Sequence, residues 1–189
     1  MRYSLKWPQY AKQWNAMTIK ANRVAEFHRY AAQILANKVR YQTIERLSGV
    51  PWELVGVLHL RESNLNWGTY LGNGQSLARK TTIVPKGRGP FNSFEDGAVD
   101  ALKIDGLTDV RDWRLEKMLF YAEAFNGGGY DSRRLPSPYL WGGSSVQVAG
   151  KYVADGRFDP KAWDTQPGVA PVLYTLFGMD STIPVVRES

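Results

Sequence analysis

Apolar residues recur at helical spacing through the first part of the chain. They fall three or four positions apart over residues 8–20 and again over residues 22–39, which predicts two amphipathic helices. A shorter helix is predicted over residues 41–47, because Ser48 and Gly49 follow it as stop signals. The N-terminal region is therefore expected to form a layer of helices.

A fourth helix is predicted from Pro51 to Glu62, and it carries the residue of greatest chemical interest. Leu54, Leu58 and Glu62 are spaced four apart, so they share one helix face. Glu62 therefore extends an apolar stripe at the start of a stretch rich in turn residues. Partial burial there would raise the pKa of its carboxyl group, which suits a proton donor. The alternative is a solvated glutamate at a helix end, where the helix dipole disfavours a negative charge.

Patterns beyond Glu62 predict one β-hairpin and several further helices. Two short strands over residues 67–71 and 78–84 lie on either side of a Gly-Asn-Gly turn. Ser93, followed by Asp96 at the capping distance, predicts the start of a helix. Further helices are predicted over residues 113–125, 144–154 and 169–177.

The expected fold class is mainly α with a small β-hairpin. The 189-residue chain has no low-complexity segment and no internal repeat, and its length suits one sizeable core. We expect a single domain over residues 1–189, in which residues 1–48 form an N-terminal helical layer and residues 49–189 form the core.

Composition narrows the chemistry and the partners. The chain has no Cys and only two His, which excludes disulfides, thiolate chemistry and an ordinary multi-His metal centre. We therefore expect no metal and no cofactor. The net charge of +6 favours an anionic partner, which could be nucleic acid, a membrane surface or an acidic cell-wall polymer.

The targeting signals and recognition motifs that the sequence lacks reduce the number of possible partners. The sequence shows neither a signal-peptide core nor an apolar stretch of membrane-spanning length, so we expect synthesis in the cytoplasm and no integral membrane association. Acidic residues are spread along the chain and no nucleic-acid recognition motif is visible, which argues against a nucleic-acid partner. We expect the chain to be a monomer.

Two short motifs lie on either side of the predicted hairpin. The first is Arg-Glu-Ser-Asn-Leu-Asn at residues 61–66, and the second is Ala-Phe-Asn-Gly-Gly at residues 124–128. They look like the Glu-Ser motif and the later Ala-Tyr-Asn-Ala-Gly motif of the lysozyme-like superfamily, which includes goose-type lysozymes, lytic transglycosylases and many phage endolysins. The direct resemblance covers residues 50–130, and residues 155–160 look like the tail of phage and bacterial members.

This resemblance implies a lysozyme-like helical domain with the hairpin beside an active-site cleft. It implies that Glu62 is the general acid, which protonates the β-1,4 glycosidic oxygen between N-acetylmuramic acid and N-acetylglucosamine in peptidoglycan. Phe125 occupies the place of the family's Tyr, so Tyr121 or Tyr130 is the candidate replacement for the missing hydroxyl. The remaining candidate substrate-binding residues are Ser63, Trp67, Tyr70, Gln75, Thr81, Asn126, Tyr139 and Trp141.

The second carboxylate that glycosidases generally use is missing from the expected place. No Asp or Glu occurs between Glu62 and Glu95, so the predicted hairpin cannot supply it. In lytic transglycosylases a single Glu acts as acid and then as base, while the C6 hydroxyl of the substrate closes a 1,6-anhydro ring. A hydrolase would instead take its base from Glu95, Asp96 or Asp100, although the first two also suit a helix start. More distant acids, Asp131 and Asp155, remain open as bases.

The resemblance therefore predicts a metal-free peptidoglycan glycosidase, either a muramidase or a lytic transglycosylase. A chain without a visible export signal suits a phage endolysin or a virion-associated lysin, which acts on the cell wall after release. One alternative keeps the fold and changes the substrate to chitin. The other alternative is a non-catalytic, basic, aromatic-rich module that binds a polymer such as nucleic acid.

Overall fold

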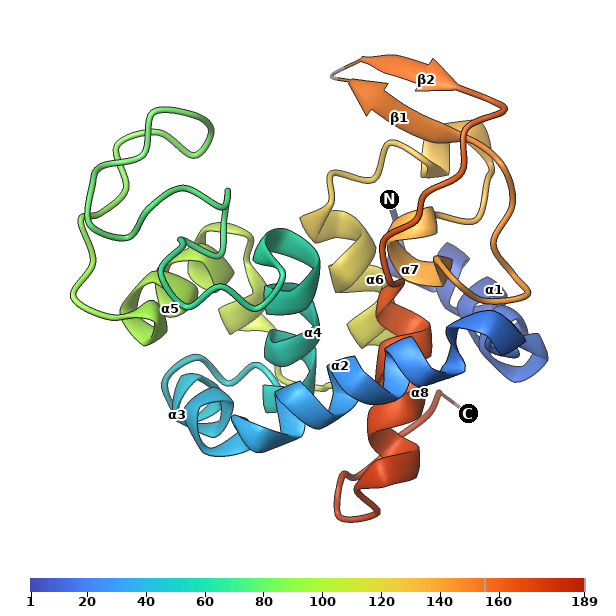
Figure 1. Ribbon diagram of the computed structural model, residues 1–189, viewed down its shortest axis with the longest axis horizontal. Coiled ribbons are helices and arrows are strands. Elements are labelled where there is room, and N and C mark those ends of the chain that lie inside the picture. Colours follow the sequence, from blue (N-terminus) through green and yellow to red (C-terminus); the bar gives the residue numbers. More distant parts are fainter. Residues whose placement is uncertain (155, 189) are drawn as a thin grey trace. The chain divides into compact units, whose positions relative to one another are not determined.

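The computed structural model describes residues 1–154 and 156–188, and it is mainly helical (Figure 1). Within these residues the only sheet has two antiparallel strands. The predicted fold class, mainly α with a small β-hairpin, is thereby confirmed. The chain divides into two compact units: unit 1 comprises Met1–Ala31 and Arg114–Ser189, and unit 2 comprises Ala32–Trp113. The expected single domain with a layer over residues 1–48 stays a prediction.

Unit 2 is built around α4 (Trp52–Ser63), with α3 (Lys38–Ser48) packed against it and α5 (Phe94–Ile104) packed against α3. Every residue of α4 from 52 to 61 is buried, so this helix is the core of the unit. Gly56 lets α4 lie close to the Ile34 side chain, because a Cβ at position 56 would be only 2.5 Å from that side chain. A short 3₁₀ turn, η2 (Leu107–Asp109), follows α5.

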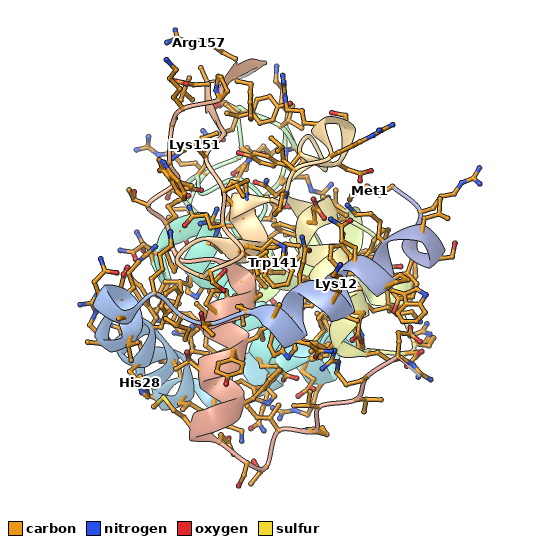
Figure 2. All side chains as sticks on the ribbon, turned by 90° about the vertical axis from the view of Figure 1, so that its right-hand side faces the viewer. Met1, Lys12, His28, Trp141, Lys151 and Arg157 are labelled. Carbon is orange, nitrogen blue, oxygen red and sulfur yellow. The ribbon has the colours of Figure 1, made fainter. Side chains whose placement is uncertain are left out.

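Unit 1 contains the remaining helices and the sheet. Helix α1 packs on α6, while α7 packs on both α6 and α8. Figure 2 labels Trp141, which is 1% exposed, and places Lys151 and Arg157 on the hairpin. The elements are α1 (Tyr3–Ala16), η1 (Ala21–Arg23), α6 (Leu115–Phe125), η3 (Asp131–Arg133), α7 (Pro138–Trp141), β1 (Lys151–Ala154), β2 (Arg157–Asp159) and α8 (Val169–Met179). Helix α2 (Val24–Ala36) contributes residues to both units.

The predicted hairpin over residues 67–84 is wrong in extent. This segment holds one isolated bridge, between Thr69 and Ser76, and it is otherwise composed of turns. Its polar side chains bond to neighbouring backbone instead of leaving the backbone free for a ladder. The hairpin of the structure lies at β1 and β2, where Lys151 pairs with Asp159.

Two predicted helices also differ from the structure. The helix predicted over residues 144–154 is absent, since β1 occupies its end and turns precede it. The first helix begins at Tyr3, so Pro8 lies inside α1 and not near its start. Pro8 has no N–H to donate, and α1 continues through it. Among the described residues, no helix combines the length and apolar character needed to cross a bilayer.

Candidate functional site

Glu62 lies in the last turn of α4, immediately after the fully buried part of that helix. Its side chain is half-buried, between buried Arg61 and half-buried Ser63. The Ser63 hydroxyl donates to the carbonyl of His59 at 3.3 Å, within the helix. Leu54 and Leu58 are fully buried as predicted, but α4 is buried on every side from residue 52 to 61 and not along one stripe. Glu62 is the first half-buried residue after this stretch.

The backbone after Glu62 takes an unusual path. Asn64 has φ 52° and Leu65 has φ 61°, so two successive non-glycine residues adopt the left-handed conformation. Asn tolerates this region, but a bulky residue such as Leu is a genuine outlier there. The N–H groups of both residues bond back to the end of α4, to the carbonyls of Leu60 and His59. Such strain concentrates at functional sites, and here it fixes the exit of the chain directly after Glu62.

The turn that follows lies against the end of α4. A Cβ added at Gly74, which has φ +72°, would sit 3.5 Å from the backbone oxygen of Glu62. The turn is closed by backbone hydrogen bonds, from Tyr70 N–H to Gln75 at 2.7 Å and from Gly74 N–H to Tyr70 at 2.8 Å. That distance is ordinary van der Waals contact, so glycine is favoured at position 74 by its left-handed backbone and not by lack of space. The predicted Gly-rich turn is thus present beside Glu62, although its flanking strands are not.

Two predicted sugar-binding residues hold the loop after this turn together. The Gln75 side-chain oxygen accepts from the N–H groups of Thr82 and Ile83, at 2.7 and 3.2 Å, and its amide donates to the Thr82 hydroxyl. Thr81 is 5% exposed; its hydroxyl donates to the Pro85 carbonyl and accepts from Arg88 N–H. Both side chains therefore have structural roles in shaping the loop.

Trp67 belongs to an aromatic cluster and not to an open stacking surface. Its ring centroid lies 4.6 Å from that of His59, 4.9 Å from Phe94 and 5.1 Å from Tyr41. The Arg40 guanidinium covers the Trp67 ring at 3.7 Å. His59 is fully buried, and burial lowers its pKa to about 4, so the ring at the centre of the cluster is neutral. The Tyr41 hydroxyl is hydrogen-bonded to His59 Nδ1 at 2.9 Å.

Tyr70 is fully buried, and its contacts hold the turn to α5. Its hydroxyl donates to Asp100 at 2.8 Å, and its ring stacks on Phe91. Arg88 bonds to the same carboxylate, with Nε 3.0 Å from Oδ2. Burial alone would raise the pKa of Asp100, but the hydrogen bonds from Arg88 and Tyr70 outweigh it and lower the pKa. Asp100 is thus committed to holding the loop to α5.

The two predicted second carboxylates lie in the first turn of α5. Arg40 binds Glu95 through two hydrogen bonds, of 2.7 and 3.1 Å, and these bonds lower the pKa of Glu95. The Ser93 hydroxyl accepts from the Asp96 N–H at 3.1 Å, so the predicted helix cap is confirmed. The Asp96 side chain is exposed. Glu95 is an ion-pair partner that stays ionised, and Asp96 stands in a helix cap.

The other predicted site residues belong to unit 1. Tyr121 is half-buried at an edge-to-face contact with Phe120, and Asn126 is the exposed C-cap of α6. Tyr130 is 6% exposed, and its hydroxyl accepts from Tyr152 N–H. Tyr139 and Trp141 are buried in α7, at 3% and 1% exposed, so neither ring has an open face. Asp131 pairs with Lys6 at 2.8 Å, and Asp155 lies outside the described residues.

Sequence reasoning missed Glu53, Arg40 and Leu65. Glu53 is 4% exposed in the first turn of α4, and burial raises its pKa to about 7. An acid one residue after the first helical position normally indicates a solvated helix start, so no sequence signal marked its burial. Arg40 couples Trp67 to Glu95, two residues far away in the sequence. The signal for Leu65 was present, as an apolar residue between Asn64 and Asn66 directly after a helix.

Within the described residues, unit 2 offers one half-buried carboxyl at a strained helix end and a firmly bonded polar loop beside it. No group of three or more His, Asp or Glu side chains in that part of the chain is arranged to hold a metal ion. The arrangement can present one acid, Glu62, next to a shaped loop. No known protein-family model, no curated protein and no solved structure matches this chain.

Proposed function

We propose that the chain is a peptidoglycan glycosidase in which Glu62 is the single acid, as in lytic transglycosylases. The observation that carries the proposal is the end of α4: a half-buried carboxyl followed by two left-handed non-glycine residues, Asn64 and Leu65. A helix end of this kind fixes the backbone on which the carboxyl is carried, and positioned acids contribute strongly to glycosidic cleavage.

Two other carboxylates of unit 2 favour the single-acid reaction over hydrolysis with two carboxylates. Glu95 and Asp100 are each bonded to an arginine, and in both the pKa is lowered. Glu62 would donate its proton to the glycosidic oxygen as the bond from C1 breaks. Its carboxylate would then accept the proton of the C6 hydroxyl as the oxygen of that group bonds to C1. The proton returns to Glu62, so no second protein carboxylate is needed.

The test is the digestion of purified peptidoglycan, followed by mass spectrometry of the released muropeptides. The wild-type chain should release products that end in 1,6-anhydromuramic acid, and Glu62→Gln should reduce the rate by at least about 100-fold because general acid catalysis is lost. Glu95→Gln is the matched control, and it should cleave at nearly the wild-type rate. Reducing-end products with loss of activity in Glu95→Gln would indicate a two-carboxylate hydrolase, and full activity of Glu62→Gln would refute the proposal.

A further inference from the structure

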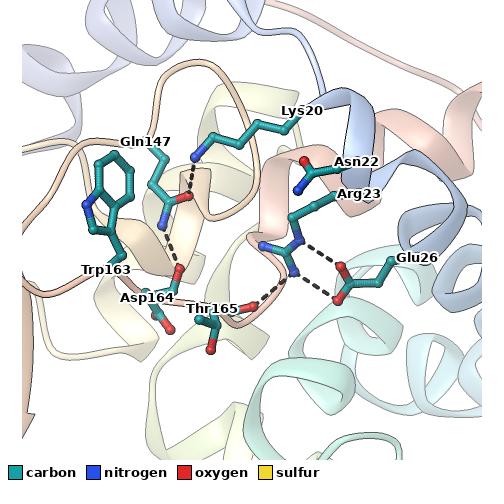
Figure 3. Close-up of a pocket in the computed structure, with 8 residues that line it drawn as sticks. All are labelled: Lys20, Asn22, Arg23, Glu26, Gln147, Trp163, Asp164 and Thr165. Atoms are coloured by element: carbon teal, nitrogen blue, oxygen red, sulfur yellow. Dashed lines mark hydrogen bonds and ion pairs between the residues drawn. The ribbon is translucent and has the colours of Figure 1, made fainter.

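A hollow of about 350 Å³ opens within unit 1, between the start of α2 and residues 163–165 (Figure 3). It is separate in sequence from Glu62 and from every residue predicted to bind substrate. Its volume is at the lower end of the range for small-molecule sites, which suits a ligand the size of one or two sugar rings. Its lining combines one large aromatic ring with several polar and charged side chains.

Trp163 supplies the apolar surface of the hollow. It is 51% exposed, and it is the only exposed tryptophan among the described residues. The Lys20 ammonium lies over the ring, and the exposed part of the indole is an apolar surface directly beside that charge. That combination suits a sugar ring, which has C–H groups on its faces and hydroxyls around its edge.

Lys20 supplies a positive charge that no carboxylate neutralises. Its ammonium lies 4.6 Å from the centroid of the Trp163 ring and 3.2 Å from the side-chain oxygen of Gln147. Among the described residues Lys20 forms no ion pair, whereas the other charges around the hollow are paired. Arg23 binds Glu26 at 2.7 Å, and Lys151 binds Asp164 at 3.1 Å. Lys20 is therefore the group around the hollow that can receive an anion.

The floor beneath Lys20 is already in place. Gln147 is 7% exposed, and its oxygen also accepts from Gly143 N–H at 2.9 Å. Its amide donates to the Asp164 carbonyl at 2.7 Å, which ties the floor to the segment that carries Trp163. Figure 3 shows Gln147 between Lys20 and Asp164, with Trp163 beside it. Since these groups are fixed before a ligand arrives, binding requires little ordering of the protein.

We propose that this hollow binds a saccharide unit that carries a carboxylate, with the sugar ring on Trp163 and the carboxylate on the ammonium of Lys20. The ligand class is N-acetylmuramic acid, so the inference rests on the proposed function and adds to it a second glycan contact in unit 1. A nucleic acid fits less well, because the carboxylates of Glu26 and Asp164 line the same hollow and would face its successive phosphates.

N-acetylmuramic acid and N-acetylglucosamine form a matched pair of probes, since the lactyl carboxylate is what distinguishes them. Their dissociation constants for the full chain can be measured by ligand-observed NMR titration. N-acetylmuramic acid should bind more tightly than N-acetylglucosamine, and Lys20→Gln should remove that difference. Trp163→Ala should weaken both sugars by roughly three- to tenfold, the range expected for loss of an aromatic contact.

Lys161→Gln and Tyr174→Ala are the controls, because both side chains are exposed in unit 1 and neither lines the hollow. Both should bind like the wild type, and all variants should retain the thermal transition of the wild type. The proposal is overturned if N-acetylmuramic acid does not bind, if Lys20→Gln and Trp163→Ala bind it unchanged, or if a short oligonucleotide competes for the same site.

The two proposals can fail independently. Glu62→Gln should bind N-acetylmuramic acid with the wild-type affinity, because the hollow does not include Glu62. If the wild type releases no muropeptides but binding depends on Lys20 and Trp163, the glycosidase proposal fails and the sugar site stands. If muropeptides are released and neither substitution changes sugar binding, only the sugar site fails.

Discussion

Helix α6 of unit 1 buries two carboxylates, and each has a cation within 4 Å, although Oε1 of Glu123 is buried without a hydrogen bond and burial raises the pKa of Glu123. Glu116 is bound by Arg187 at 2.6 Å and by the Glu188 N–H at 3.0 Å, while Glu123 faces Lys6 at 3.8 Å and accepts from the Tyr10 hydroxyl. Helix α4 of unit 2 also buries titratable groups, but Glu53 forms no salt bridge within the described residues. His59 has a buried Nε2 without a hydrogen-bond partner.

The turns after the two helices also differ, because the turn after α6 is relaxed and the turn after α4 is strained. Gly127 and Gly128 follow α6 with φ +85° and +63°, a conformation that glycine adopts without strain. Asn64 and Leu65 follow α4 in the same left-handed region without that freedom. In α6 each buried carboxylate has a cation within 4 Å and the turn that follows is relaxed. In α4 Glu53 has no such cation among the described residues and the turn is strained, and α4 is the helix that carries Glu62, so the comparison supports placing the function there.

Replacement of Glu53 by Gln should give the largest change in the free energy of unfolding. Burial raises the pKa of Glu53 from 4.5 to about 7, so the folded state holds a proton that the unfolded state releases. This contribution to stability is complete below pH 4.5 and is lost as the pH rises through 7. Glu53→Gln mimics the protonated form and should therefore be more stable than the wild type at pH 8, by about 3 kcal/mol.

The pH profile of the same variant tests His59. Burial lowers the pKa of His59 from 6.5 to about 4, so its contribution is complete above pH 6.5 and is lost as the pH falls through 4. In the wild type this loss on acidification opposes the gain from Glu53 between pH 4.5 and 6.5. The free energy of unfolding, measured with urea, should hardly change with pH in that range for the wild type. For Glu53→Gln it should fall as the pH is lowered. Parallel profiles would contradict the raised pKa of Glu53, and a flat profile for Glu53→Gln would contradict the lowered pKa of His59.

The same substitution on α6, Glu116→Gln, should have the opposite sign. It removes the charge that Arg187 binds and leaves a guanidinium with a weaker partner. Hydrogen bonds to charged groups contribute about 1.5–3 kcal/mol, so we expect a loss of about 2 kcal/mol at pH 8. Urea unfolding at that pH measures both variants. A gain in stability for Glu116→Gln would remove the distinction between α4 and α6.

The helices were largely predictable from sequence, and the reason is local. Ser93 and Asp96 cap α5 as predicted, and Gly49 ends α3 in the left-handed conformation, because caps depend on neighbouring residues. The hairpin was misplaced because its signal is short. The apolar run before and within β1 is too short for its spacing to separate a helix from a strand, and pairing with residues 157–159 decided between them.

The candidate site was predictable only in part. The placement of Glu62 at a helix end followed from the four-residue spacing of Leu54, Leu58 and Glu62. The pairing of Arg40 with Glu95 could not be predicted, because the two residues are brought together by the packing of α3 on α5. Gln75 and Thr81 were assigned to substrate because polar loop residues have no sequence signal that separates backbone bonding from ligand binding.

Gly127→Ala tests the relaxed turn after α6. A Cβ at Gly127 would meet no atom within 4 Å, so the effect isolates the left-handed backbone conformation. We expect a loss of about 1 kcal/mol, the lower part of the range for a residue with a side chain in that region. Thermal unfolding against the wild type measures it, with Ala124→Gly as a control for helix propensity at a neighbouring exposed position. An unchanged stability would mean that the glycine is not required there.

Leu65→Gly tests the strained turn after α4 and should change stability least. Relief of the left-handed strain is worth about 1–2 kcal/mol, and loss of the half-buried side chain together with the greater freedom of the unfolded chain offsets most of it. The net change should stay within about 1 kcal/mol. Cleavage of peptidoglycan should nevertheless fall by at least about tenfold, because small displacements of a catalytic group reduce rates steeply. Wild-type activity in a stable Leu65→Gly variant would show that the strain does not position Glu62, and the distinction between the two helix ends would then be structural only.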